Sequence, residues 1–188
     1  HVDYCEDHVE ESYNKTVLST KNLLEIAKQS GAKLVYISTD YVFDGKHGPY
    51  EEEAKTNPLS VYAKHKLEAE QMTLAANKNN LVLRVTNVYG KEERNKNFVA
   101  RILDQCVQKQ TLHLTLPYDQ YATPVNAWDI ARAMLVLLKE NRSGIFHIGG
   151  TDWMNRVELA FTVLKYFPEA KYTMQPMQTT EMQQAANR

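Results

Sequence analysis

The sequence predicts an α/β fold built on a parallel sheet. Three apolar runs that are typical of buried strands lie at residues 33–39, 81–85 and 144–150. A nearly continuous apolar run is expected where helices cover both faces of a parallel sheet. Helical patterns separate the three runs, and strands that alternate with helices imply βαβ units.

Composition and charge exclude several classes of partner. The 188 residues are 43% hydrophobic and 24% charged, which is ordinary for a globular domain with a sizeable core. The formal net charge of −1 gives no electrostatic footprint for nucleic acid or an anionic membrane. No apolar run approaches the roughly 20 residues of a membrane span. We therefore expect no nucleic-acid or membrane partner.

The cysteines and histidines give no metal or redox motif. Cys5 and Cys106 lie far apart, which indicates two reduced thiols in a cytoplasmic protein. The six histidines are scattered without the spacing of metal ligands. No metal site is expected.

Local signals define the elements of the first half of the chain. A helical pattern covers residues 10–29 and ends at Gly31, which suits a helix C-terminus. A loop rich in Gly, Pro and Asp follows the first strand at residues 44–50. Ser60 is placed to cap the next helix, which we predict over residues 61–76.

The second half of the chain continues the alternation of helices and strands. Its predicted elements are a helix at 97–108, a short strand at 112–114, and helices at 126–138 and 156–167. The tail from residue 172 onward shows little periodicity, so no regular element is predicted there.

A hydroxyl and a Tyr/Lys pair suggest proton-transfer chemistry. Thr39 ends the first strand, and Tyr62 and Lys66 open the helix after it. Residues four apart lie on one helix face, so Lys66 can stabilise a Tyr62 phenolate and lower its pKa from about 10. A positioned phenol that donates a proton beside an aligning hydroxyl is general acid chemistry, and it suits reduction of a ketone.

Two motifs resemble those of the extended short-chain dehydrogenase/reductases. They are the run Ser-Thr-Asp-Tyr-Val-Phe-Asp-Gly at 38–45 and a Tyr-x-x-x-Lys motif that begins 23 residues after Thr39. The run is most similar to that of the dTDP-4-dehydrorhamnose reductases. The resemblance implies the C-terminal portion of a Rossmann-like, doubly wound parallel sheet with a small substrate-binding lobe. It places the sheet domain at 1–90 and the lobe mainly at 91–188, with 125–150 returning to the sheet.

The same resemblance implies NADPH or NADH as cofactor and a nucleotide-linked 4-keto-6-deoxy sugar as substrate. Tyr62 would protonate the carbonyl oxygen, Lys66 would hold the nicotinamide ribose, and Thr39 would position the carbonyl. Ser38 and Val88 would also line the cofactor site. The implied substrate contacts are Tyr41, Asn87, Asn97 and Gln120.

Asn14 falls on an asparagine that, in the family, supports the active-site lysine through a water. The segment resembles the family pattern Asn-x-x-Gly-Thr-x-Asn-Leu-Leu only in part. A polar residue on a solvated helix face is the alternative interpretation of Asn14.

Two features depart from the family pattern. No Gly-rich turn occurs near the start of the chain, although such a turn binds the pyrophosphate of a dinucleotide. We therefore expect the chain to lack the first βα units of the fold, roughly 60 residues or more at about 30 residues per unit, and its C-terminus also looks cut. Asn87 stands where rhamnose reductases carry a Trp that faces the sugar, which leaves the exact substrate open.

Two other functions remain open. The regulatory β-subunit of methionine adenosyltransferase shares the Asp-Tyr-Val-Phe-Asp-Gly run and the Tyr-x-x-x-Lys helix, and it acts by binding a partner. A sugar-nucleotide epimerase is a second alternative. A dehydratase is disfavoured, because that group needs an Asp-Glu pair where Asp40 is followed by Tyr41. The family resemblance is compatible with a homodimer.

Overall fold

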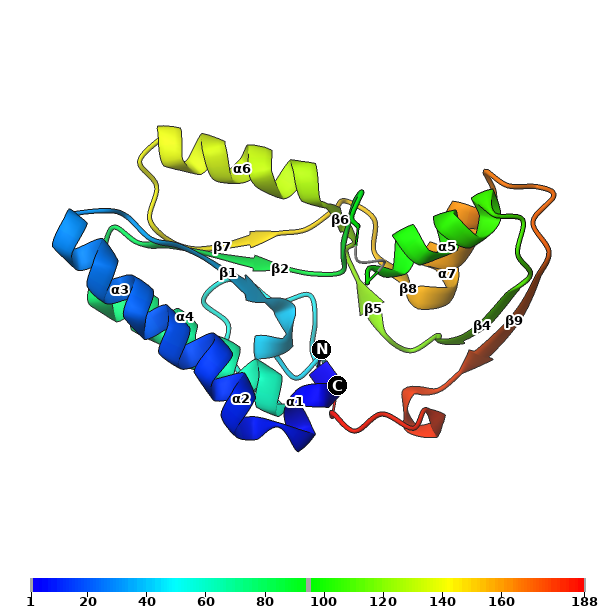
Figure 1. The fold of residues 1–188 in the computed structure, drawn as a ribbon, viewed down its shortest axis with the longest axis horizontal. Helices are drawn as coiled ribbons and strands as arrows, with labels where there is room; N and C mark the ends of the chain where they lie inside the picture. Colours follow the sequence, from blue (N-terminus) through cyan, green and yellow to red (C-terminus); the bar gives the residue numbers. More distant parts are fainter. Residues whose placement is uncertain (1, 94–95, 188) are drawn as a thin grey trace. The chain divides into compact units, whose positions relative to one another are not determined.

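The computed structural model describes residues 2–93 and 96–187, which form two compact units (Figure 1). The first unit contains the chain up to Val85, Arg132–Ile148 and the residues from Gln184 onward. The second contains Thr86–Ala131 and Gly149–Gln183. These boundaries differ by a few residues from the division expected from the sequence. The assignment of the two units to cofactor and substrate stays a prediction.

The first unit is built on a parallel sheet of three strands. Its strands are β1 (Val35–Thr39), β2 (Leu81–Val85) and β7 (Gly144–Ile148), in the order β1-β2-β7. Thr39 lies opposite Val85, and Val85 lies opposite Ile148, so the carboxyl ends of the strands are level. The predicted α/β class with a parallel sheet is confirmed.

The central position of β2 in the sheet explains why its sequence is so apolar. Leu81, Val82 and Leu83 of β2 are fully buried. Helix α4 (Val61–Ala76) packs against β1 and β2. Figure 1 shows α3 and α4 on one side of the sheet, with α6 (Ala127–Lys139) on the other. Residues that face both layers must therefore be hydrophobic, as in other covered parallel sheets.

Four helical segments precede the sheet, where the sequence predicts one helix. They are α1 (Val2–Asp7), α2 (Val9–Tyr13), the π-helix η1 (Asn14–Leu18) and α3 (Ser19–Ser30). The last three cover the predicted range 10–29, but the π-helical turn in the middle is not predicted. Gly31 adopts the left-handed conformation (φ 67°) at the end of α3, which confirms the predicted C-terminus.

Helix α4 begins where the sequence places it. Ser60 is its N-cap residue, and the Ser60 hydroxyl accepts a hydrogen bond of 3.2 Å from the Ala63 backbone N–H. We expect Ser60→Ala to lower the free energy of unfolding by about 1 kcal/mol, because one buried backbone donor loses its partner. Urea unfolding of the two proteins measures this difference. An unchanged midpoint would show that the cap contributes nothing.

The second unit combines two helices with short strand pairs. Its helices are α5 (Phe98–Val107) and α7 (Arg156–Leu164). Its strand pairs are β3 (Val88–Tyr89) with β6 (Val125–Asn126), β4 (Leu112–Pro117) with β9 (Tyr172–Met177), and β5 (Tyr121–Ala122) with β8 (Met154–Asn155). The core of the unit joins α5, α7 and β4 through Ile102, Cys106, Leu112, Leu116, Ala160, Val163 and Leu164.

The tail differs most from the sequence-based expectation. Strand β9 runs parallel to β4, and a short 3-10 helix, η3 (Thr179–Glu181), follows it. The residues of β9 are exposed or half-buried, and Met174 packs against the core of the unit. A strand that buries so little of its surface gives only a weak alternating pattern, so periodicity did not reveal it. Backbone pairing with β4 defines this strand instead.

Among the helices of residues 2–93 and 96–187, none combines the length and the apolar character that crossing a bilayer requires.

Candidate active site

Thr39 is fixed at the carboxyl end of β1. Its hydroxyl accepts a 3.2 Å hydrogen bond from the Tyr41 backbone N–H, and it donates one of 3.1 Å to Asp40 Oδ1. It thereby caps the short 3-10 helix η2 (Asp40–Val42), which directs the chain away from the sheet. Thr39 is 5% exposed. The strand end therefore presents a hydroxyl in a defined position.

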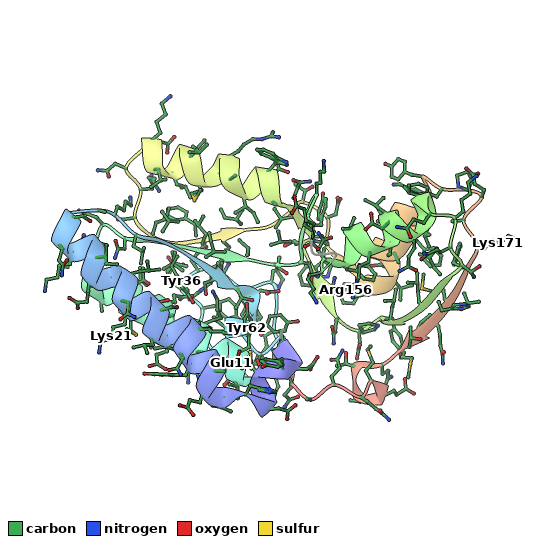
Figure 2. All side chains as sticks on the ribbon, viewed as in Figure 1. Glu11, Lys21, Tyr36, Tyr62, Arg156 and Lys171 are labelled. Carbon is green, nitrogen blue, oxygen red and sulfur yellow. The ribbon has the colours of Figure 1, made fainter. Side chains whose placement is uncertain are left out.

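Tyr62, the second residue of α4, meets this strand end. Its hydroxyl lies close enough to the side chain of Thr39 for that side chain to lower the pKa of the phenol. The ring of Tyr41 lies edge-on to the Tyr62 ring, with centroids 6.1 Å apart. Figure 2 shows Tyr62 between the end of β1 and the helices that cover this face. The structure thus brings together three of the side chains that the sequence predicts for the site.

Lys66 follows one helical turn after Tyr62. Its ammonium donates a hydrogen bond to the Ile37 backbone carbonyl and lies 4.2 Å from the centroid of the Tyr36 ring. Tyr36 is labelled beside the same face of β1 in Figure 2. A cation over an aromatic face gains electrostatic stabilisation. The side chain is thus held against β1 from two directions.

Burial governs the electrostatics of the site. It raises the pKa of Tyr62 to about 12, and the side chain of Thr39 acts in the opposite direction. Burial lowers the pKa of Lys66 to about 8, against the attraction of the Glu70 carboxylate. The Tyr62 pKa is therefore raised and not lowered as predicted, because burial is the largest cause of its shift. Tyr62 is a neutral phenol at neutral pH, which is the form that donates a proton.

Two site residues were missed by the sequence analysis. Glu70 lies one turn beyond Lys66 on α4 and accepts a 2.8 Å hydrogen bond from Ser38 Oγ. Arg84 of β2 forms a buried salt bridge with Glu70. Ser38 therefore contacts α4, while its predicted contact with a cofactor stays a prediction. An Arg in an otherwise apolar strand was the available signal, since a buried charge requires a partner.

Asn14 lies on the exposed side of the first helices. It begins η1 with its side chain exposed, whereas Ser12 and Val17 on neighbouring turns are buried. Among the described hydrogen bonds, none joins Asn14 directly to Lys66, which is half-buried on α4. The exposure agrees with the alternative interpretation, a polar residue on a solvated helix face, and support of Lys66 through a water stays a prediction.

A predicted substrate contact, Asn87, and a predicted cofactor contact, Val88, are near the start of the second unit. Asn87 has a left-handed backbone (φ 39°), and its side-chain oxygen accepts a 2.5 Å hydrogen bond from Arg156. Val88 lies in β3 and is 37% exposed. Figure 2 labels Arg156 at the start of α7. Contact of Asn87 or Val88 with a ligand stays a prediction.

Two further candidates in the second unit have structural partners. Asn97 caps α5: its side-chain oxygen accepts from the Ala100 N–H at 2.8 Å, and its amide donates to the Gly90 carbonyl at 2.9 Å. Gln120 donates to Thr179 Oγ1 at 3.0 Å. Both side chains are therefore oriented by this unit alone, and their contact with substrate stays a prediction.

A covered parallel sheet with Thr39, Tyr62 and Lys66 at the carboxyl end of one strand is the arrangement of the extended short-chain dehydrogenase/reductase class. The chain belongs to the RmlD substrate binding domain family, whose model matches residues 1–188.

Curated relatives fall into two functional groups. Methionine adenosyltransferase 2 subunit beta from Bos taurus is 34% identical over 170 residues, covering 88% of this chain and 51% of that protein. A dTDP-4-dehydrorhamnose reductase from Sinorhizobium fredii is 34% identical over 173 residues, covering 86% of this chain and 57% of that protein. The chain thus spans about half the length of the curated relatives it matches.

Solved structures support the same family. A dTDP-4-dehydrorhamnose reductase from Clostridium acetobutylicum superposes with a TM-score of 0.90 at 31% identity, covering all of this chain and 65% of that one. The enzyme of that name from Bacillus anthracis, in complex with NADP, gives a TM-score of 0.90 at 27% identity, with the same coverage.

Proposed function

We propose that this chain supplies the proton-transfer site of an NAD(P)H-dependent reductase that acts on a nucleotide-linked 4-keto-6-deoxy sugar. The observation that carries the proposal is the neutral Tyr62 hydroxyl beside Thr39, at the end of a parallel strand. Similarity to reductases of this substrate class at 31–34% identity supports the choice of substrate.

The residues of the first unit have separate tasks in this reaction. Tyr62 donates its proton to the carbonyl oxygen as that oxygen gains negative charge. Thr39 donates a hydrogen bond that aligns the same oxygen. Lys66 places a positive charge one turn away, which stabilises the phenolate left on Tyr62. The edge of the Tyr41 ring borders the phenol and shields it from water.

The nicotinamide end of a dinucleotide fits this arrangement. Tyr62 and Lys66 present a hydroxyl and an ammonium on one helix face beside the carboxyl end of a parallel strand, where open α/β sheets bind ligands. Lys66 would hold the ribose hydroxyls. When bound, the reduced cofactor supplies the hydride for the carbonyl carbon. None of the seven glycines of this sequence forms the Gly-rich turn that binds a pyrophosphate.

The test is turnover by the full-length protein. Oxidation of NADH and of NADPH would be followed with dTDP-4-dehydrorhamnose, for the wild type beside Tyr62→Phe. Turnover that is lost in the variant supports the reductase and identifies the preferred cofactor. Equal turnover by both proteins would refute the assignment of Tyr62.

A regulatory subunit is the second candidate function, and the similarity to methionine adenosyltransferase 2 subunit beta favours it. Such a protein would bind NADP(H) without consuming it and would associate with a methionine adenosyltransferase catalytic subunit. Isothermal titration with NADPH, followed by size-exclusion chromatography with that catalytic subunit, separates the two functions.

A sugar-nucleotide epimerase would instead give an epimer with no net oxidation of NAD(P)H.

The reductase reaction should lose rate on the alkaline side of neutrality. Lys66 is protonated below its pKa of about 8 and neutral above it, whereas Tyr62 keeps its proton up to about pH 12. Loss of the Lys66 charge removes the electrostatic support of the phenolate, so we expect kcat to fall as the pH rises through about 8. A pH profile of kcat from 6 to 10 measures this. A flat profile across that range would contradict the role of Lys66.

A further inference from the structure

Helix α4 contacts the end of β1 through three side chains on one face. Tyr62, Lys66 and Glu70 follow each other at four-residue spacing, so they lie one above the other. Tyr62 lies beside the side chain of Thr39, and Lys66 donates to a backbone carbonyl of β1. Glu70 completes the series by accepting the 2.8 Å hydrogen bond from Ser38 Oγ.

The register of the sheet explains why Glu70 can accept hydrogen bonds from side chains on two strands. Ser38 of β1 and Arg84 of β2 are direct neighbours in the parallel ladder. Arg84 Nε lies 3.1 Å from Glu70 Oε2, and its Nη2 lies 2.5 Å from Glu70 Oε1. This two-point contact between a guanidinium and a carboxylate fixes both orientation and distance. Glu70 is thereby held rigidly below Lys66.

Stability alone does not account for this pair. The side chains of Arg84 and Glu70 are 4% and 2% exposed. Removing two charges from water is costly, and apolar replacements for a buried ion pair are often neutral or stabilising. The pair nevertheless lies next to Ser38, the residue that precedes Thr39. Its position therefore indicates that the pair fixes the geometry of the end of β1, where Thr39 lies.

We propose that Glu70 is a positioning residue of the proposed reduction: it ties the strand end that carries Thr39 to the helix that carries Tyr62 and Lys66. This inference rests on the proposed function for its effect on kcat. Glu70 acts through Ser38 and Lys66, without touching the reacting atoms itself.

The electrostatic surroundings of Lys66 agree with this role. The titratable groups that interact with its ammonium are Glu70 on α4 and Tyr36 on β1. Glu70 is the group that raises the pKa of Lys66 against the effect of burial. Loss of the carboxylate should therefore make the Lys66 amine neutral at a lower pH.

The test compares two changes with one control in the full-length protein. Glu70→Gln keeps an oxygen that can accept from Ser38 but removes the charge. Glu70→Leu combined with Arg84→Met removes the whole pair without leaving a buried charge. Glu68→Gln, at an exposed position of the same helix, is the control.

Three quantities are measured for each protein: Tm, kcat with dTDP-4-dehydrorhamnose, and the pH dependence of Lys66 acetylation by acetic anhydride, followed by mass spectrometry. We expect the double variant to keep the wild-type Tm while its kcat falls roughly 10- to 100-fold, as for a small misplacement of catalytic groups. The midpoint of Lys66 acetylation should move to lower pH in both Glu70 variants and stay unchanged in Glu68→Gln.

The outcomes separate this inference from the proposed function. If the double variant keeps the wild-type kcat and acetylation midpoint, Glu70 has no positioning role. If Glu70→Gln fails to fold, the double variant decides the question, since it buries no unpaired charge. If the wild type reduces no keto sugar, the proposed function fails, while the acetylation midpoint still shows whether Glu70 controls the state of Lys66.

Discussion

Replacing Tyr62 with Phe is expected to lower kcat for carbonyl reduction by about 10²- to 10⁴-fold, the usual contribution of a positioned general acid. Phe keeps the aromatic ring that packs edge-on against Tyr41 and removes only the hydroxyl. Loss of the single hydroxyl beside Thr39 should cost at most about 1 kcal/mol of stability, so the fold should persist. Steady-state kinetics and circular dichroism of the same preparation measure both effects.

A matched control for this change is Tyr166→Phe. Tyr166 is 74% exposed and lies in the second unit. Its loss of a hydroxyl should change neither kcat nor Tm. A Tyr62→Phe protein that reduces the sugar as fast as this control would rule out Tyr62 as the proton donor.

The second large effect is expected for Lys66→Met. Methionine has a similar length and can still pack on the Tyr36 ring, but it offers no charge and no donor to the Ile37 carbonyl. We expect kcat to fall by about 10²- to 10³-fold, as when one preorganised stabilising group is removed from an active site. The KM for NADPH should rise as well, because the proposed contact with the ribose is lost.

The neighbouring lysine gives a direct comparison. Lys64 lies on the same helix with an exposed side chain. Lys64→Met removes the same charge from the protein without touching β1, so its kinetics should match the wild type. If both substitutions lowered kcat equally, the effect would come from net charge and not from the position of Lys66.

The part of the site that depends on local order could be predicted from the sequence. Thr39 closes an apolar run that is typical of a buried parallel strand, so it is expected at the carboxyl end of that strand. Ser60 fixes where α4 begins. Once that start is known, the four-residue spacing places Tyr62 and Lys66 on one face. Strand β1 and helix α4 then meet because their apolar sides must be buried.

Features that depend on distant pairing could not be predicted in the same way. Strand β9 is exposed or half-buried along its whole length, so little in its own sequence distinguishes it from a loop. The π-helical turn of η1 is a second feature of this kind. It holds one residue more than an α-helical turn, which changes the face that later residues present, and the sequence gives no signal for it.

The three-stranded sheet is assembled from segments that are far apart in the chain. The residues between β2 and β7 form most of the second unit, so Leu81 can pair with Gly144 only after that intervening chain has been brought back on itself. The entropy of closing such a loop must be overcome before β7 adds its hydrogen bonds. A fragment that stops at Val85 would retain β1, α4 and the Tyr62 site, but β2 would be left with an unpaired edge. Such an edge is a template for pairing with other chains, so the return of β7 to the first unit also protects β2 from aggregation.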